Sequence, residues 1–202
     1  MEWWGVLLAT IGGFFVVSTT VSAALRPAKW PLKNRTLVIT GGSSGIGKAV
    51  AAAALREGAS VALLARRPDV LTAARDDLMA PGLLLAQRVT THSVDVTDDA
   101  AVKATMQAIA AAHGGQIDAL VCSAGTSSPR EFEVVTAKEF EDVWRVNVLG
   151  TRNAVAAAVP FMTAGSGRVV LVSSQAGQTG LFGYTTYSVR ALPPLPVIDY
   201  LS

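Results

Sequence analysis

The segment TGGSSGIG at residues 40–47 carries the clearest chemistry in the chain, because it can bind the diphosphate of a nucleotide. It lies between a short apolar run at residues 37–39 and an alanine-rich helical run at 48–56. Glycines let the backbone turn tightly and approach a diphosphate, and the N–H groups that open the next helix favour an anion. A flexible turn is the alternative, but the order strand, glycine turn, helix predicts the opening of a nucleotide-binding βαβ unit. The candidate binding residues here are Gly41, Ser43, Ser44, Gly45, Ile46 and Gly47.

Two adjacent arginines, Arg66 and Arg67, indicate which dinucleotide binds. They follow the apolar run at residues 60–65, which is predicted to be the second strand. Sites specific for NAD usually have an acid at the end of this strand, where it binds the ribose 2′-hydroxyl. Here Asp69 falls within the next predicted helix instead. A guanidinium suits a 2′-phosphate because it is always charged and forms paired hydrogen bonds, so NADP(H) is favoured over NAD; a solvated pair of arginines is the alternative.

Strand-like and helix-like segments alternate along the chain, which predicts an α/β fold. Short apolar runs bounded by turn residues are typical of buried parallel strands. The alternation predicts a doubly wound parallel sheet, Rossmann-like, with right-handed crossovers. Asp98 is expected to begin one helix as its N-cap or first-turn acid, and Gly150 to lie near the join of two others. Strands are predicted at residues 37–39, 60–65, 88–95, 119–123 and 168–173, and helices at 48–56, 69–79, 98–113, 137–148 and 153–163.

Composition limits the classes of function. The chain has 202 residues, of which 50% are apolar and 16% charged, so it can form one domain with a substantial core and is not a disordered chain. The 17 basic and 15 acidic residues give a net charge of +2, and no basic stripe interleaves with aromatic residues, so no nucleic-acid partner is expected. Cys122 is the single cysteine, which excludes an internal disulfide and is compatible with a reducing compartment. His92 and His113 lack ligand partners at metal-site spacing, so no metal site is expected.

Residues 3–25 contain no charged side chain and are predicted to form a transmembrane helix. Such a helix would be about 35 Å long, enough for a hydrocarbon core of roughly 30 Å. A signal peptide is a second interpretation: Val21-Ser22-Ala23 is similar to a cleavage site, although the start carries only Glu2 instead of basic residues. A buried core helix, the third interpretation, would normally show a polar face, which is missing here.

Basic residues gather on one side of this predicted anchor, at positions 26, 29, 33 and 35, and none precedes it. The positive-inside rule then places the rest of the chain in the cytosol. Pro27 and Pro31 predict a short, stiff, non-helical connector. The predicted organisation is a transmembrane anchor at residues 1–26, a basic linker at 27–35, a dinucleotide-binding domain at 36–188 and an atypical proline-rich tail at 189–202.

Several motifs, in this order along the chain, resemble the short-chain dehydrogenase/reductase family. The glycine spacing at residues 40–47 is Thr-Gly-x-x-x-Gly-x-Gly, as in that family. Cys122-Ser123-Ala124-Gly125 stands where the family usually shows Asn-Asn-Ala-Gly, so the last two residues agree and the first two do not. Asn147 stands at the family's helix asparagine, and Tyr187 follows Ser174 by thirteen residues, the family's spacing of its catalytic serine and tyrosine. Any one of these residues could be ordinary packing or capping; their order together carries the resemblance.

The resemblance implies a nicotinamide cofactor and hydride transfer to a ketone carbon. Tyr187 would then protonate the developing alkoxide, and Ser174 would hydrogen-bond and orient the carbonyl. Asn147 would hold a water in the proton relay. The resemblance also adds three cofactor contacts, which are Asp95 near the adenine, Ala124 and Gly125.

Two longer stretches, residues 25–47 and 172–188, are similar to the membrane-anchored branch of the family that reduces long-chain sphingoid ketones. This similarity implies NADPH-dependent reduction of 3-ketosphinganine to sphinganine, a step of sphingolipid biosynthesis. It also implies a protein of the endoplasmic reticulum membrane whose catalytic domain faces the cytosol. A membrane anchor suits a long-chain substrate, because such a substrate partitions into lipid.

The chain departs from the family after Tyr187. The family has a lysine four residues after this tyrosine, where it activates the tyrosine and binds the nicotinamide ribose; here that position is Ala191. Arg190 is one residue early, and Pro193 with two further prolines disfavours the helix that would carry it to the tyrosine. We therefore expect a truncated domain after residue 188.

Such a domain is expected to keep five strands, with one sheet edge unpaired and apolar surface uncovered. The helix that normally pairs subunits would be missing as well, so a family-like homo-oligomer is not expected. Three outcomes stay open at this point: an active reductase, a membrane-tethered NADP-binding fragment without activity, and a chain that does not fold stably.

Overall fold

The computed structural model describes residues 30–79 and 88–188. The chain divides into two units, Met1–Pro31 and Leu32–Ser202, and the fold lies in the second. The predicted anchor at residues 1–26, part of the predicted linker and the predicted tail at 189–202 lie outside the described residues. Within the described ranges, no helix is both long enough and apolar enough to cross a membrane.

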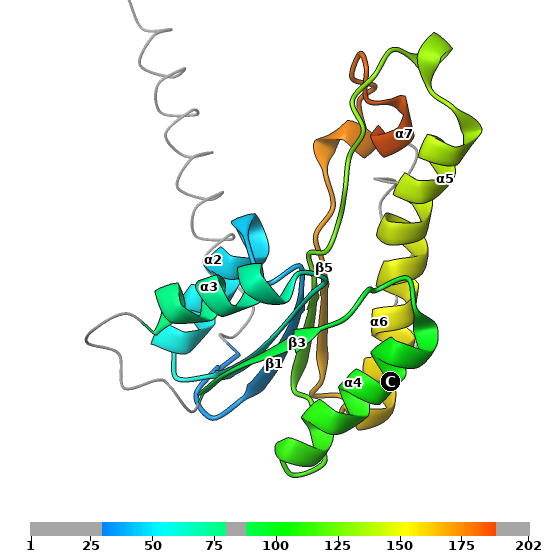
Figure 1. The fold of residues 1–202 in the computed structure, drawn as a ribbon. Coiled ribbons are helices and arrows are strands. Elements are labelled where there is room, and N and C mark those ends of the chain that lie inside the picture. The colour runs from blue at the N-terminus through cyan, green and yellow to red at the C-terminus, as the bar shows by residue number, and fades with distance from the viewer. Residues whose placement is uncertain (1–29, 80–87, 189–202) are drawn as a thin grey trace, which may run out of the picture. The chain divides into compact units, whose positions relative to one another are not determined.

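A five-stranded parallel sheet in the order β3-β2-β1-β4-β5 forms the centre of the fold (Figure 1). The chain moves outward from β1 to β2 and β3, then returns to the other side of β1 for β4 and β5, so the predicted doubly wound sheet is confirmed. Within the described residues β5 pairs only with β4 and forms one edge of the sheet. The strands are β1 (Thr36–Thr40), β2 (Ser60–Ala65), β3 (Val89–Ser93), β4 (Ala119–Cys122) and β5 (Arg168–Leu171).

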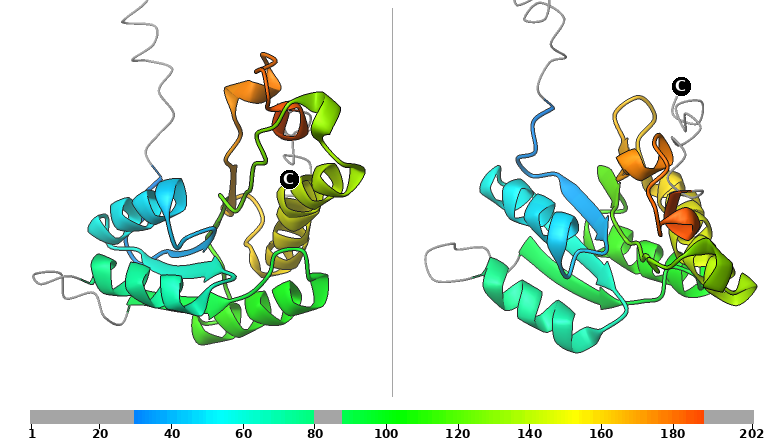
Figure 2. Two further views of the ribbon diagram at one scale, coloured as in Figure 1. Left: turned by 45° about the horizontal axis from the view of Figure 1, so that its top comes forward. Right: turned by 90° about the horizontal axis from the view of Figure 1, so that it is seen from above.

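Helices cover both faces of this sheet, with α2 and α3 on one face and α4 and α6 on the other (Figure 2); α5 continues the line of α6 beyond the sheet (Figure 1). The predicted N-cap of α4 is confirmed, because the Asp98 carboxylate accepts a hydrogen bond from Ala101 N. The long helices are α2 (Gly45–Arg56), α3 (Pro68–Leu78), α4 (Asp99–Ala112), α5 (Ala137–Trp144) and α6 (Gly150–Ala158), with the π-helical turn η3 (Arg145–Leu149) between the last two. The short helices are η2 (Phe132–Val134), η4 (Val159–Phe161), η5 (Gln175–Gly177) and α7 (Thr185–Ser188).

The core between the sheet and the α4 and α6 helices uses alternate strand positions. β2 contributes Ala62 and Leu64 to it, and β4 contributes Leu120 and Cys122, because side chains two residues apart in a strand point to the same face. Small alanine side chains on α6 let this helix lie close to the sheet and to α4. The helices contribute Val102, Met106, Ile109 and Ala110 from α4, and Ala154, Ala157 and Ala158 from α6.

Asp118 holds the starts of β1 and β4 in register. Its carboxylate accepts hydrogen bonds from Arg35 Nη1 at 2.6 Å and from Thr36 N at 2.8 Å. Its own N–H donates to Thr36 O at 3.0 Å. These bonds satisfy an acid that is only 9% exposed, and they align the two central strands whose far ends form the site described below.

Gly150 lies at a join as expected, because η3 ends at Leu149 and α6 begins at Gly150, but the helical backbone is not interrupted there. The helical run continues from Ala137 to Ala158, and the backbone angles of Gly150 are helical, with φ −59° and ψ −42°. This glycine is used for close packing instead: a Cβ at position 150 would lie 2.5 Å from Val96 Cγ2. The contact joins α6 to the segment that follows β3, and sequence periodicity gives no signal for it.

Replacing Gly150 with alanine is expected to destabilise the fold. Alanine is the better helix former by about 1 kcal/mol, so helix propensity alone would predict stabilisation. The contact with Val96 reverses the sign, because overpacking a core position costs about 1–3 kcal/mol. Thermal and urea unfolding of the Gly150→Ala protein measure the change. The double variant Gly150→Ala with Val96→Ala, which removes the clashing methyl, should recover part of the loss; an unchanged loss would contradict this explanation.

Candidate active site

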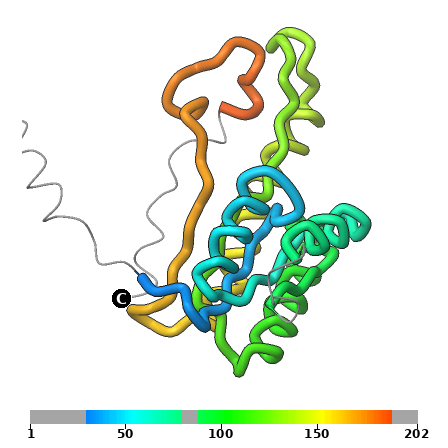
Figure 3. The backbone as a smooth tube through the Cα atoms, turned by 90° about the vertical axis from the view of Figure 1, so that its left-hand side faces the viewer, coloured from blue at the N-terminus to red at the C-terminus, as the bar shows by residue number. Residues whose placement is uncertain are grey.

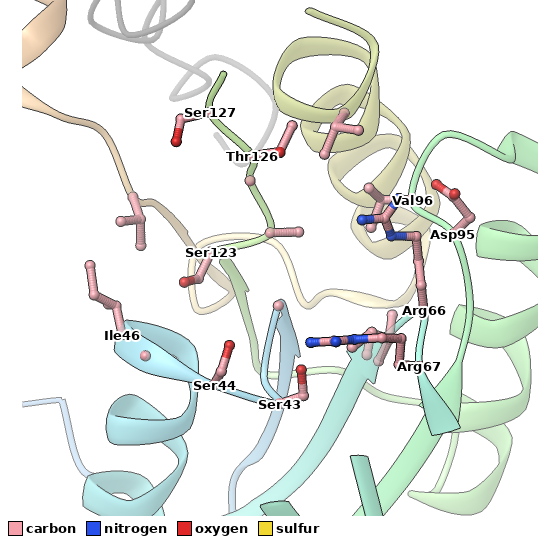
Figure 4. A pocket seen from close by; sticks show the side chains of 18 of the residues that line it. Ser43, Ser44, Ile46, Arg66, Arg67, Asp95, Val96, Ser123, Thr126 and Ser127 are labelled. Carbon is pink, nitrogen blue, oxygen red and sulfur yellow. The ribbon is translucent and has the colours of Figure 1, made fainter. Parts of the chain in front are cut away.

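A cleft of about 550 Å³ opens where the carboxyl ends of the strands meet (Figure 4). Segments after all five strands line it, with the glycine turn between β1 and α2 near its middle. The cleft is therefore at the point where the strand order reverses, the usual binding crevice of doubly wound sheets. Two of the predicted site residues, Gly47 and Asn147, do not line the cleft. The other predicted site residues do, and they are Gly41, Ser43, Ser44, Gly45, Ile46, Arg66, Arg67, Asp95, Ala124, Gly125, Ser174 and Tyr187.

The glycine turn requires glycine for two different reasons. Gly41 has φ +68°, in the left-handed region, and a Cβ there would lie 2.7 Å from Ala124 N. Gly47 lies inside α2 with no unusual backbone angle, but a Cβ there would lie 2.5 Å from Gly41 O. Gly41 therefore lets the turn contact the loop after β4, and Gly47 lets α2 pack directly on the turn.

The N-terminus of α2 fits an anionic group. Ser44 is its N-cap residue, yet its side chain makes no capping hydrogen bond, and the first turn contains no acid. The first N–H groups of a helix have no partners within the helix, and the helix dipole adds positive potential there. Figure 4 shows the side chains of Ser43 and Ser44 directed into the cleft. The diphosphate of a dinucleotide fits this combination of open backbone donors, hydroxyl groups and absent Cβ atoms.

Arg66 and Arg67 follow β2 and extend into the same cleft (Figure 4). Both side chains are exposed, and neither takes part in an ion pair within the described part of the chain. Asp69, by contrast, belongs to the first turn of α3 and does not line the cleft. This end of the cleft is therefore cationic and suits a ligand with an additional phosphate.

Asp95 and Val96 form the cleft wall after β3, in a turn with its own hydrogen bonds. Asp95 Oδ1 accepts from the N–H and from the hydroxyl of Thr97, each at 2.9 Å. Asp98 N donates to Asp95 O at 3.0 Å. The wall is therefore a defined turn rather than a loose loop, and it lies next to the arginine pair because β3 and β2 are neighbours.

Ser174 and Tyr187 line the cleft from the segment after β5. Ser174 Oγ accepts a hydrogen bond from Ala176 N at 3.2 Å as the N-cap of η5, which leaves the hydroxyl proton able to point elsewhere. Tyr187 lies in α7, and its ring meets that of Tyr184 edge to face, with centroids 6.2 Å apart and an interplanar angle of 78°. The structure thus brings the two predicted catalytic residues to one cavity.

Asn147 does not line the cleft itself but binds a residue that does, Thr126. It is buried in η3, where its Oδ1 accepts from Thr126 N and its Nδ2 donates to Thr126 O, each at 2.8 Å. Its carbonyl accepts from the Thr151 hydroxyl at 2.8 Å. The amide therefore holds the loop after β4 in place, and its part in a proton relay stays a prediction.

Sequence reasoning missed several polar residues of the loop after β4. Thr126 and Ser127 follow Gly125 directly and line the cleft. Two contacts bring this loop beside the Tyr187 segment, Arg130 N to Gly183 O at 2.8 Å and Thr186 Oγ1 to Ser128 O at 3.3 Å (Figure 3). Their position in the sequence could have identified them, because residues just after the carboxyl end of a central parallel strand usually line the binding crevice.

The Cys122 thiol, near the cleft at the end of β4, is expected to report unfolding. It is 4% exposed, and burial raises its pKa to about 12. At pH 8–9 the folded protein should react slowly with iodoacetamide, because only the thiolate attacks, whereas the chain in guanidinium should react fast. Above the unfolded-state pKa the unfolded chain releases a proton that the folded state keeps, so stability falls as pH rises. In the Cys122→Ala protein, the free energy of unfolding should fall less between about pH 8 and 10. An equal fall in both proteins would show that the Cys122 thiol does not cause it.

The fold and the cleft define a class, the dinucleotide-binding α/β proteins with a serine and a tyrosine beside the cofactor crevice. The family model for short chain dehydrogenase matches residues 35–189, and the chain belongs to this family. Members of this family use a nicotinamide cofactor, NAD or NADP, so the predicted family is confirmed and the class of cofactor with it.

Relatives and solved structures agree with this assignment. The chain is 38% identical over 186 residues to mouse 3-ketodihydrosphingosine reductase, covering 91% of this chain and 56% of the mouse protein. It is 37% identical over 184 residues to zebrafish 3-dehydrosphinganine reductase, covering 91% and 55%. A short-chain dehydrogenase/reductase structure from Mycobacterium ulcerans superposes with a TM-score of 0.73 at 30% identity, over 79% of this chain and 58% of that one. The chain thus spans about half the length of the relatives it matches.

Proposed function

We propose that this chain binds NADPH and reduces a long-chain sphingoid ketone, 3-ketosphinganine, to sphinganine. One observation carries the proposal: a single cleft is lined by the glycine turn, by the arginine pair on the β2 side and by Ser174 and Tyr187 on the β5 side. The names of the mouse and zebrafish relatives support the substrate class.

The cofactor would lie across the carboxyl edge of the sheet. The N-terminus of α2, with Ser43 and Ser44, would hold the diphosphate, and Arg66 and Arg67 would hold the 2′-phosphate. This orientation places the nicotinamide toward the β5 side, where Tyr187 lies. The fit follows from the missing Cβ atoms at the turn and from the two arginines without acidic partners among the described residues.

The residues of the chain would handle the proton and the carbonyl oxygen. NADPH, when bound, supplies the hydride. Tyr187 would donate its hydroxyl proton to the oxygen as negative charge develops there. Ser174 would donate a hydrogen bond to the same oxygen, and its Oγ is already oriented by Ala176 N.

Removing the arginine pair is expected to change the choice of cofactor. The double variant Arg66→Ala with Arg67→Ala should bind NADPH about 10- to 100-fold more weakly, since hydrogen bonds to charged groups contribute about 1.5–3 kcal/mol. Its affinity for NADH, which has no 2′-phosphate, should change little. Fluorescence titration with both cofactors measures the ratio. Arg56→Ala, in the last turn of α2, is the control and should leave both affinities unchanged. If the double variant loses affinity for NADPH and NADH equally, the arginines do not contact the 2′-phosphate.

A second function, NADPH binding without reduction, is favoured by one residue. Ala191 stands four positions after Tyr187, where the family has a lysine that activates the tyrosine. A chain without that cation would keep the cofactor cleft and lose most of the proton transfer. The two functions differ in turnover and not in binding.

NADPH consumption with 3-ketosphinganine, measured on the full chain in detergent, separates the two functions. Turnover by the unaltered protein supports the reductase, and turnover only by an Ala191→Lys variant supports the binding function. If neither protein turns over while both bind NADPH, the reductase proposal is refuted and the binding function stands. If neither binds NADPH, the cofactor assignment fails first.

We also propose that the uncharged segment at residues 3–25 anchors the protein in the endoplasmic reticulum membrane with the domain in the cytosol. The basic residues that follow this segment support that orientation. Carbonate extraction of microsomes should leave the chain in the membrane, and added protease should digest the domain without detergent. Release by carbonate, or protection of the domain, would overturn the proposal.

A further inference from the structure

Asn153 is a buried polar residue of α6 that does not line the cleft. It is 5% exposed, and its Nδ2 donates to Val96 O at 3.1 Å. Its Oδ1 accepts from Arg152 Nη1 at 3.2 Å. The orientation of the amide is thus determined by its partners, because a carbonyl lies on one side and a guanidinium on the other. A buried amide with both ends satisfied holds its neighbours in one arrangement.

Val96, the acceptor of this bond, is a lining residue of the cleft and follows Asp95 directly. α6 contacts Val96 twice, through the Asn153 amide on its carbonyl and through Gly150 against its side chain, where a Cβ would come within 2.5 Å of Cγ2. The turn at Asp95 and Thr97 fixes the other side of the same short segment. The position of the cleft wall after β3 is therefore set from α6.

This wall belongs to one end of the cleft. β3 is the outer neighbour of β2, so Asp95 and Val96 lie on the side of Arg66, as Figure 4 shows. Ser174 and Tyr187 enter from beyond β5, at the opposite edge of the sheet. A dinucleotide whose 2′-phosphate meets the arginines would place its adenosine, and not its nicotinamide, against Val96.

We infer that Asn153 is a positioning residue for the adenosine end of the dinucleotide, acting through the main-chain carbonyl of Val96. The inference rests on the proposed NADPH binding. Without the Nδ2 donor, the buried Val96 carbonyl would lack this partner and would turn to find another. The adjoining Asp95 and the Val96 side chain would shift with it, and the adenosine pocket would lose its shape. The nicotinamide end, built from other segments, should not respond.

Two substitutions at position 153 remove the donor in different ways. Asn153→Leu keeps the size of the side chain and removes both polar atoms. Asn153→Asp keeps the shape and the acceptor for Arg152, replaces the Nδ2 donor with a second carboxylate oxygen and adds a negative charge that Arg152 faces; it also serves if the leucine variant does not fold. Ala154→Gly is the matched control, because residue 154 is fully buried on the same helix, and glycine there weakens α6 while the Asn153 hydrogen bond to Val96 stays in place.

Calorimetric titration of the full chain in detergent, with three probes, tests the inference. The probes are NADPH, 2′,5′-ADP for the adenosine end and reduced nicotinamide mononucleotide for the other end. Both Asn153 variants should lose about tenfold in affinity for NADPH and 2′,5′-ADP, the effect of one lost hydrogen bond, and bind the mononucleotide as the unaltered protein does. Ala154→Gly should lower the melting temperature and leave all three affinities unchanged.

The outcomes separate this inference from the proposed function. If the unaltered protein binds neither NADPH nor 2′,5′-ADP, the proposed function fails and this inference fails with it. If the unaltered protein binds both and the Asn153 variants bind 2′,5′-ADP equally well, the positioning role alone is refuted. The same holds if Ala154→Gly shows an equal loss of affinity, or if mononucleotide binding falls in parallel, because the effect is then a general loss of structure.

Discussion

Replacing Gly47 with alanine is expected to weaken NADPH binding by about 100-fold or more, equivalent to about 3 kcal/mol. Alanine would improve the helix propensity of α2 by about 1 kcal/mol, so a purely local view predicts a gain. The new Cβ would instead lie 2.5 Å from Gly41 O and 3.2 Å from Gly42 Cα. Both neighbours are backbone atoms that cannot rotate away, so the helix must move off the turn. The N–H groups at its start would then no longer point at the diphosphate.

Gly180→Ala is the matched control for this prediction. A methyl group added at position 180 would have no atom of the described residues within 4 Å, and this glycine has no left-handed φ, so the same chemical change should be neutral there. Fluorescence titration gives the NADPH affinity of both proteins, and circular dichroism shows whether Gly47→Ala remains folded. A folded Gly47→Ala protein that binds NADPH as tightly as Gly180→Ala would show that α2 does not hold the diphosphate.

Tyr187→Phe is expected to lower kcat by about 10²- to 10⁴-fold, the usual contribution of a general acid. The substitution removes one oxygen and keeps the ring that packs edge to face on Tyr184, so the fold should not change. The affinity for NADPH should stay within about twofold, because the proposed cofactor contacts come from α2 and β2. Steady-state turnover is measured in whichever protein is active, the unaltered chain or the Ala191→Lys variant.

Tyr184→Phe provides the comparison for Tyr187→Phe. It removes an equivalent hydroxyl from the other ring of the pair, and Tyr184 does not line the cleft. Its turnover should remain close to that of the unaltered protein. If Tyr187→Phe keeps its activity, or if both variants lose activity to the same extent, Tyr187 is not the proton donor.

Much of the fold could be predicted from the sequence because its signals are short in range. The strand predicted at residues 60–65 has those bounds in the structure, and Asp98 caps α4 as expected. Apolar runs of strand length, an N-cap acid and a glycine turn each involve adjacent residues, so they are visible without tertiary information. The order of these elements along the chain was enough to predict a doubly wound parallel sheet.

Other features were invisible because they join distant segments. Glycine is typical of helix ends, yet Gly150 lies in an uninterrupted helical run; glycine is needed there because Val96 occupies the space where a side chain would be. Asn147 is predicted to hold a water of the proton relay, but the sequence gives no sign that its amide also binds Thr126, 21 residues away. No local rule connects Asn153 with Val96, 57 residues apart.

The sequence by itself determined the glycine turn, the arginine pair, the serine and tyrosine spacing and the alternation of strands and helices, because each depends on residue type and local order. Only the tertiary structure decided that these groups share one cleft, and which buried amides and glycines hold its walls. Those arrangements depend on how the sheet and its two helix layers pack, and packing contacts between remote residues leave no periodic trace in the chain.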